Sequence, residues 1–471
     1  MTPDDFRKRG HELIDWIADY RSRVAARPVM AQTAPGEIRR RLPTTPPQIP
    51  ESFEAVLRDL DGVVVPGLSH WSHPMFFGYF PCNGELSSVL GDYVSTGLGV
   101  LGLAWQSSPA LTELEEVATD WLRQMLGLSD RWSGVIQDTA STSTLVALLC
   151  AREKISQYSF ARAGLAGERL PLVVYASAHS HSSVEKAALL AGFGREHLRL
   201  IPHDAAFAMR TDALEAAISD DLAAGRRPCA IVATTGTTTT TALDPIDDIG
   251  RVAAAHGTWL HVDAAMAGSA MILPECRGLW DGIERADSLV VNPHKWLGAA
   301  FDCTVYFVRE PADLIRVMST NPSYLQTAAD QQVKNYRDWG IPLGRRFRAL
   351  KLWFLIREQG VARLQARLRR DIANAAWLAG EVARTPHWRV LNRVTLQTVC
   401  VRHEPAGVSG DALDRHTLDW VDRLNRSGAA YLTPAVLDGR WMARVSVGSL
   451  TTERKDVEEL WKEMRTLVGN S

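Results

Sequence analysis

The N-terminal segment combines one amphipathic helix with a proline-rich stretch. Thr2-Pro3-Asp4-Asp5 offers an N-cap residue, a proline at the first helical position and two acidic residues, which together favour a helix start. Apolar residues then recur at helical spacing to about residue 25, whereas prolines crowd residues 28–50, which we expect to be extended. Such an arm has little core of its own, so we expect its apolar stripe to be buried against a second subunit.

The middle of the chain alternates apolar, β-rich runs with helical stretches. Strands are expected at residues 172–175, 230–234, 259–262, 289–291 and 304–308. Near-continuous apolar strands separated by helices indicate a parallel sheet covered on both faces. A long helix at 345–359 then leads into a mixed segment. We expect an N-terminal arm over 1–85, a large α/β domain over 86–345 and a small α+β domain over 346–471.

Composition and charge narrow the class of protein. Hydrophobic residues make up 46% and charged residues 23% of the 471 positions, which is typical of a globular enzyme. With 52 Lys and Arg against 54 Asp and Glu, the net charge of −2 favours neither a nucleic-acid nor a membrane partner. Six scattered cysteines, the absence of a long apolar run and an acidic N-terminus predict a reduced, cytoplasmic protein without a structural zinc.

The densest chemical signal surrounds Lys295. Asn292-Pro293-His294-Lys295-Trp296 follows an apolar strand, where open α/β sheets place ligands, and His261-Val262-Asp263-Ala264-Ala265 ends the preceding strand. Taken alone, Lys295 could be a partly exposed structural lysine, and Asp263 could cap the next segment. Together they provide an amine that forms a Schiff base with an aldehyde and a carboxylate that keeps a pyridine nitrogen protonated. Pyridoxal phosphate (PLP) requires both groups.

Three further features have both a ligand-binding and a structural interpretation. Residues 137–144, rich in Ser and Thr before an apolar helix, could bind phosphate or simply cap the helix. His181 could stack on a flat ring or lie on the surface, and Ser182-Ser183-Val184-Glu185 after it predicts a capping box. The threonine run 237–241 could donate to a ring oxygen or form a turn without a role in binding.

The ordered motifs resemble the group II PLP-dependent decarboxylases and, within them, the aromatic-L-amino-acid decarboxylases. Besides the segments around Lys295, Asp263 and His181, the likeness includes Ser108-Pro109-Ala110 and Pro342-Leu343-Gly344-Arg345-Arg346-Phe347. It implies the PLP-dependent transferase fold of type I (aspartate aminotransferase-like), an α/β fold with a central, mostly parallel seven-stranded sheet. It also implies a homodimer with active sites at the interface and exchanged N-terminal arms.

The resemblance assigns roles to individual residues. Lys295 would form the Schiff base with PLP, Asp263 would pair with the pyridinium nitrogen, and His181 would stack on one face of the ring. Tyr324, on a polar segment over 320–338 that suits a lid, would protonate the substrate Cα. The other cofactor-binding positions are Ala265 against the second ring face, Ala140, Ser141, Asn292 and His294 for the phosphate, Thr238 near the ring hydroxyl, and Leu343.

The same resemblance outlines a substrate pocket. It would be lined by Trp71, Phe80 and Pro81, together with Leu101 and Leu103 of the partner subunit. This apolar wall suits an aromatic side chain, and Gly344 leaves space for an indole. We therefore expect decarboxylation of an aromatic L-amino acid to its amine and CO2, with tryptophan-like substrates first, then phenylalanine, tyrosine or DOPA.

Two other functions remain open from the sequence. An aromatic acetaldehyde synthase would couple decarboxylation to oxidative deamination on the same fold. Tyr324 and His181 favour simple decarboxylation, because relatives with phenylalanine at the tyrosine position tend to yield an aldehyde. A non-catalytic scaffold could retain the fold without the cofactor, but the presence of both Lys295 and Asp263 argues against it.

Overall fold

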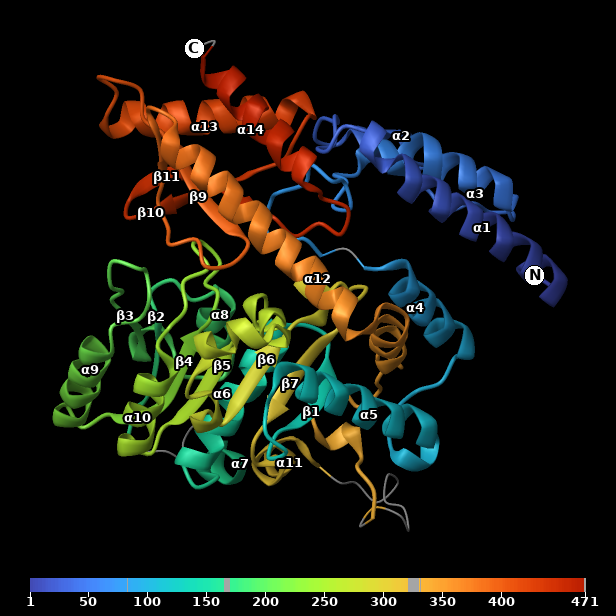
Figure 1. The fold of residues 1–471 in the computed structure, drawn as a ribbon. Coiled ribbons are helices and arrows are strands. Elements are labelled where there is room, and N and C mark those ends of the chain that lie inside the picture. Colours follow the sequence, from blue (N-terminus) through green and yellow to red (C-terminus); the bar gives the residue numbers. More distant parts are fainter. Residues whose placement is uncertain (83, 165–169, 321–329, 331, 470–471) are drawn as a thin grey trace. The chain divides into compact units, whose positions relative to one another are not determined.

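The computed structural model describes residues 1–82, 84–164, 170–320, 330 and 332–469 (Figure 1). The chain divides into two compact units. The first comprises Met1–Pro81, Arg370–Leu391 and Gln397–Ser471, and the second comprises Cys82–Arg369 and Asn392–Leu396. Among the described residues, every helix is too short or too polar to cross a membrane.

The second unit is built on a seven-stranded sheet in the order β1-β7-β6-β5-β4-β2-β3 (Figure 1). Its strands are β1 (Ser133–Gln137), β2 (Leu172–Ser177), β3 (Leu198–Ile201), β4 (Arg227–Thr234), β5 (Trp259–Asp263), β6 (Ser288–Val291) and β7 (Thr304–Val308). Only β7 runs antiparallel to its neighbours β1 and β6. The expected, mostly parallel seven-stranded sheet of this α/β fold is therefore confirmed.

Helices bury the sheet and explain its apolar strands. The helix α6 (Ala140–Ile155) packs against both α8 (Ser183–Leu190) and α11 (Pro311–Met318). The helices α9 (Thr211–Ala223) and α10 (Ile246–His256) pack against each other and against β4. Another helix, α5 (Pro109–Leu126), packs on β1. Strands covered in this way expose neither face to water, so β2, β5, β6 and β7 consist entirely of buried residues.

The first unit contains a four-stranded antiparallel sheet in the order β10-β11-β9-β8. Its strands are β8 (Trp388–Val390), β9 (Thr398–His403), β10 (Thr433–Leu437) and β11 (Arg440–Ser446), and α13 (Gly410–Ser427) and α14 (Arg454–Gly469) accompany them. The N-terminal helices α1 (Pro3–Arg23), α2 (Glu37–Arg41) and α3 (Phe53–Asp59) belong to the same unit. The boundary between the units falls within α12 (Ala349–Arg384).

Of three local predictions, the start of α1 is confirmed, whereas the capping box after His181 and the fully extended arm are not. The Thr2 hydroxyl accepts the Asp5 N–H at 3.1 Å, and the Asp5 carboxylate accepts the Thr2 N–H at 3.0 Å. These bonds confirm the predicted start of α1. The capping box after His181 does not form, because Ser182 has helical backbone angles (φ −56°, ψ −16°) and its side chain makes no capping bond. The arm is also not wholly extended: α2 forms between the prolines, after a left-handed Gly36.

Candidate active site

Asp263 and Lys295 follow neighbouring parallel strands. Asp263 is the buried last residue of β5, and register pairs it with Val290 of β6. Lys295 is half-buried in the short turn Pro293–Leu297 after β6, where its φ of −96° and ψ of −111° interrupt the helical geometry. The Asp263 carboxylate accepts the Ala265 N–H at 3.0 Å. The parallel register therefore brings an acid and an amine to the same sheet edge.

The turn that carries Lys295 is held by buried polar groups. The Asn292 N–H donates to the Ala265 carbonyl at 2.9 Å, and the Asn292 side-chain oxygen accepts the Thr304 hydroxyl at 2.9 Å. His294 Nδ1 lies 2.9 Å from the Cys303 carbonyl oxygen. Burial, reinforced by the Lys295 ammonium, lowers the pKa of His294 to about 4. His294 is therefore a neutral imidazole at physiological pH.

His181 lies within electrostatic reach of both charged residues. Its Nδ1 accepts the Ser183 N–H at 3.2 Å and lies 2.8 Å from the Ser183 hydroxyl oxygen, which places the ring proton on Nε2. Partial burial lowers the pKa of His181, the Asp263 carboxylate acts to raise it, and the Lys295 ammonium acts to lower it. The side chain is exposed as a whole. A neutral, accessible ring is available to lie against a flat ligand.

The start of α6 offers backbone donors beside these residues. Ala140 packs in one apolar cluster with Ala265 and Val290, and Ser141 is exposed. The first N–H groups of a helix have no intrahelical partner and sit at the positive end of its dipole, so they suit a phosphate. Thr304 joins this segment to the Lys295 turn, because its hydroxyl contacts both Asn292 Oδ1 at 2.9 Å and the Asp138 carbonyl oxygen at 3.1 Å.

The threonine run after β4 divides into structural and exposed members. The hydroxyls of Thr237 and Thr240 lie 3.0 Å apart, and the Thr241 hydroxyl donates to the Thr240 carbonyl at 2.7 Å. These three residues are buried, whereas Thr238 is exposed. Of the five threonines, Thr238 is thus the one classed as exposed, while Thr239 is half-buried.

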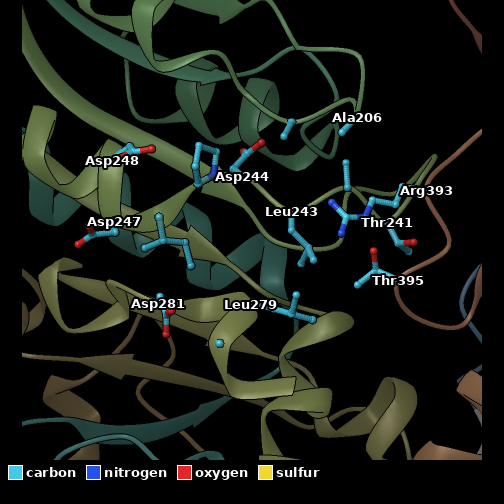
Figure 2. Close-up of a pocket in the computed structure, with 15 residues that line it drawn as sticks. Ala206, Thr241, Leu243, Asp244, Asp247, Asp248, Leu279, Asp281, Arg393 and Thr395 are labelled. Atoms are coloured by element: carbon cyan, nitrogen blue, oxygen red, sulfur yellow. The ribbon is translucent and has the colours of Figure 1, made fainter. Parts of the chain in front are cut away.

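A cavity of about 360 Å³ lies beside the same loop (Figure 2). Its lining includes Thr241, Asp244, Asp247, Asp281 and Arg393, and none of the predicted site residues. Buried Asp244 accepts the N–H groups of Met209 and Thr234, each at 2.7 Å, and burial raises its pKa to about 7. These bonds hold the loop that carries Thr238.

Gly344 and Leu103 meet in the second unit. A Cβ on Gly344 would lie 4.0 Å from Leu103 Cδ2, and the neighbouring Gly102 N–H donates to the Arg345 carbonyl at 2.9 Å. Leu101 and Leu343 are exposed. The structure therefore brings the 101–103 segment and the 343–345 segment of one chain together.

The remaining predicted wall residues belong to the first unit. The Trp71 ring stacks on Phe76 and Tyr79, with centroids 4.8 Å and 5.4 Å away. Phe80 lies under the Arg444 guanidinium at 4.1 Å, and Pro81 is buried. Tyr324 and most of the 320–338 segment lie outside the described residues.

Comparisons with known proteins identify one family, both from a conserved domain and from relatives that match nearly the whole chain. Residues 35–404 match the pyridoxal-dependent decarboxylase conserved domain. The chain belongs to this family. Phenylacetaldehyde synthase of Arabidopsis thaliana is 38% identical over 98% of this chain and 95% of its own length. Aromatic-L-amino-acid decarboxylase of Bos taurus is 39% identical over 100% and 97%.

A solved structure shows the same architecture. The crystal structure of Oryza sativa TDC with PLP and tryptamine superposes with a TM-score of 0.96 at 36% identity, covering 100% of this chain and 99% of that one. This decarboxylase is accordingly a PLP-dependent carboxy-lyase of the aromatic amino acid decarboxylase family, with the fold of type I.

The residues at the sheet edge fit PLP chemically. An aldehyde requires an amine, which Lys295 provides, and a pyridinium nitrogen requires a carboxylate, which buried Asp263 provides. The α6 start provides donors for a phosphate. Ala140 and Ala265 share one apolar cluster, and neither has a side chain beyond Cβ. Donor types and burial agree with this cofactor.

Sequence reasoning missed several residues that hold the predicted site residues in place. Thr304 carries no local signal, because its bonds reach residues far away in the chain. Arg444 lies fully buried on β11, where burial lowers its pKa to about 10, and it donates to the Tyr79 carbonyl beside Phe80. A charged residue inside the apolar run Trp441–Val445 was the available signal, since an isolated buried cation is costly.

Proposed function

We propose that this decarboxylase converts aromatic L-amino acids to amines and CO2, acting first on tryptophan-like substrates and then on phenylalanine, tyrosine or DOPA. The observation that carries the preference is the space at Gly344, where, apart from the two adjacent residues, the nearest atom to a Cβ position is Leu103 Cδ2 at 4.0 Å. The similarity to Oryza sativa TDC, whose structure contains tryptamine, supports an indole substrate.

The residues at the sheet edge would each contact a different part of the cofactor. When bound, PLP supplies an aldehyde that bonds to amines and a cationic ring that withdraws electrons from the substrate Cα. We assign Lys295 as the amine that holds the cofactor and Asp263 as the carboxylate that keeps the ring nitrogen protonated. Asp263 suits this role because it is buried and its orientation is set by the Ala265 N–H.

Other residues would orient the ring and move the proton. We assign His181 and Ala265 to its two faces. The first turn of α6, with Ala140 and Ser141, binds the phosphate together with Asn292 and His294. Thr238 and Leu343 complete the cofactor contacts. Tyr324 is the proposed acid at Cα, an assignment that rests on the sequence. Trp71, Phe80 and Pro81, with Leu101 and Leu103 of the partner subunit, are proposed to contact the aromatic side chain.

The test is product identification with a matched active-site variant. The purified protein, supplied with PLP, is incubated with a panel of L-amino acids, and products are identified by mass. Tryptamine formed faster than the other amines is the expected result; no amine from any aromatic substrate would contradict the proposal. Borohydride reduction and peptide mapping should place a pyridoxyl group on Lys295 and find none there in Lys295→Ala.

An aromatic acetaldehyde synthase is the second candidate, favoured by the 38% identity to phenylacetaldehyde synthase. It would release an aldehyde, CO2, ammonia and hydrogen peroxide while consuming oxygen and water. We expect amine without peroxide from the wild type and a shift toward aldehyde in Tyr324→Phe. Stoichiometric peroxide from the wild type would instead establish the synthase activity.

We also propose a homodimer. The buried residues of α4 (Leu86–Leu98) are small: Ser88, Gly91 and Ser95. Its exposed residues include Leu86, Leu90, Tyr93, Val94 and Leu98. On α1 no residue is buried, and Phe6 and Ile14 are exposed. Exposed apolar residues that recur at helical spacing, as on α4, indicate a partner. Analytical ultracentrifugation should show a dimer for the wild type, and Leu90→Asp should weaken the association of its subunits.

A cytoplasmic location is also proposed, from the cysteine pattern of the sequence.

A further inference from the structure

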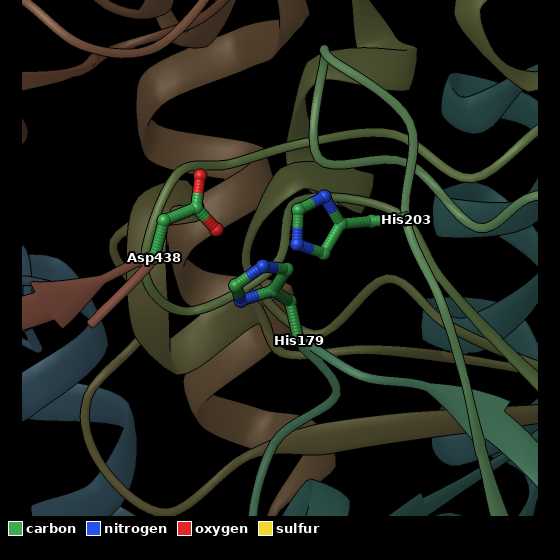
Figure 3. A group of neighbouring side chains, drawn as sticks. All are labelled: His179, His203 and Asp438. Carbon is green, nitrogen blue, oxygen red and sulfur yellow. The ribbon is translucent and has the colours of Figure 1, made fainter.

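Two histidines lie side by side after β2 and β3. His179 follows β2 and His203 follows β3 by two residues each, and the Ala178 N–H donates to the Ile201 carbonyl at 3.0 Å. Their ring centroids are 4.6 Å apart with an interplanar angle of 46° (Figure 3). Because β2 and β3 are parallel neighbours, the sheet itself holds the two side chains together.

The ring nitrogens are oriented for a shared ligand. His203 Nδ1 lies 2.8 Å from the Asp204 carbonyl oxygen, which can only accept, so Nδ1 carries the proton and Nε2 carries the lone pair. Figure 3 shows a nitrogen of each ring turned toward the other ring, and the ligand nitrogens lie within 4.8 Å of each other. Asp438, also labelled there, lies on the β10–β11 turn of the first unit.

The surroundings restrict how the two rings can move. Phe207 packs against both, with centroids 5.6 Å from His179 and 5.2 Å from His203. A carbonyl bound to the far nitrogen is the usual partner of a metal-ligating histidine, because it fixes the tautomer and the ring orientation. His203 has this partner in Asp204.

We propose that His179 and His203 bind one divalent transition-metal ion of the zinc, copper or nickel class, with water completing the coordination. Neutral imidazoles favour these ions, whereas magnesium and calcium favour oxygen ligands. Two nitrogens on a tetrahedral zinc, each at about 2.0–2.1 Å, lie about 3.3 Å apart. The ring nitrogens, which lie within 4.8 Å of each other, would move to that separation when the metal binds.

The metal would link the ends of two strands next to His181. The segment between β2 and α8 is short, with the Ser180 N–H donating to the Ser177 carbonyl at 2.9 Å and His181 following directly. A metal bridge from His179 to His203 therefore ties this segment to β3. Metal binding itself is independent of the proposed substrate.

Calorimetric titration of the PLP-loaded protein with zinc chloride tests the site. We expect one high-affinity zinc per chain, and we expect His179→Gln and His203→Gln each to weaken it by about tenfold or more. His197→Gln is the matched control, because His197 is half-buried and has a carbonyl 3.0 Å from Nδ1, that of Phe193. This variant should bind zinc as the wild type does, and magnesium should not compete.

A second readout separates this site from other zinc ligands. Copper(II) bound to the wild type should show two imidazole nitrogens by electron paramagnetic resonance, and each variant should lose one. Circular dichroism establishes that the variants are folded. Absence of zinc binding in the wild type would overturn the proposal. So would unchanged affinity in both variants, which would place the zinc elsewhere, such as at half-buried Cys82 or Cys276.

Discussion

Arg345 and Glu115 form a buried ion pair, with Arg345 Nη2 2.5 Å from Glu115 Oε1. The same Glu115 oxygen accepts the Ile136 N–H at 2.8 Å, and Arg345 Nη2 donates to the Ile136 carbonyl at 2.6 Å. This network fastens the Gly344 segment and α5 to β1, just before the chain enters the α6 start. The predicted substrate wall and the predicted phosphate site thus share one buried support.

Removing one partner of this pair should destabilise the protein strongly. Arg345→Met leaves the Glu115 charge uncompensated in the interior, which typically costs about 3–5 kcal/mol. Arg346→Met is the control, because half-exposed Arg346 contacts Asp92 at 3.3 Å and surface pairs contribute about 1 kcal/mol or less. Urea unfolding at constant protein and PLP concentration measures both; equal losses would contradict the buried support.

Asp263→Asn should keep the fold but lose most activity. The amide cannot hold a pyridine nitrogen in its protonated form, so we expect kcat to fall by about a hundredfold or more. Asp287→Asn is a matched control at the opposite end of the strands, where the Asp287 carboxylate accepts the Leu260 N–H at 2.8 Å. The rate of amine formation at steady state is measured for both variants. A similar loss of kcat in both would contradict the proposed role of Asp263 at the ring nitrogen.

Thr304→Val should weaken cofactor binding without abolishing folding. The variant loses the hydroxyl that contacts Asn292 and Asp138, a loss of about 1 kcal/mol or about fivefold in PLP affinity. Thr258→Val is the control, since the buried Thr258 hydroxyl donates to the Ala253 carbonyl of its own segment, at 3.4 Å. Fluorescence titration with PLP gives the dissociation constants, and an unchanged value for Thr304→Val would show that the link is dispensable.

Gly344→Ala should select against the largest substrates. The added Cβ lies in ordinary contact with Leu103 at 4.0 Å, so the fold tolerates it while the space beside it shrinks. We expect kcat/KM for tryptophan to fall about tenfold relative to phenylalanine. Gly340→Ala, whose Cβ would lie 3.6 Å from Gln137, controls for the substitution. An unchanged substrate ratio would place the indole elsewhere.

Stability should fall on acidification because buried histidines must take up protons. Burial lowers the pKa of His261 to about 4. The unfolded chain therefore binds more protons between pH about 6.5 and about 4, so the free energy of unfolding falls as pH drops through this window. Between about pH 7 and about pH 5, the free energy of unfolding of His261→Gln should fall by about 2 kcal/mol less than that of the wild type. His256→Gln, at an exposed position, is the control for urea unfolding; equal pH slopes for His261→Gln and the wild type would contradict the prediction.

Structural features that follow from short, local sequence patterns could be predicted. The apolar runs of β2, β4, β5, β6 and β7 marked the sheet, and the strand ends marked Asp263 and Lys295. The strands β1 and β3 were not predicted, because Ser133–Gln137 and Leu198–Ile201 are short and mix polar with apolar residues. Their strand conformation comes from pairing with β7 and β2.

The sequence by itself determined the alternation of strands and helices, the start of α1 and the position of the acid and the amine at adjacent strand ends. Each follows from side-chain periodicity or from backbone groups a few residues apart. Only the tertiary structure decided that Glu115 meets Arg345, that Thr304 joins Asn292 to Asp138 and that His179 faces His203. These contacts bridge distant segments, so they exist only once the sheet has brought its strand ends together.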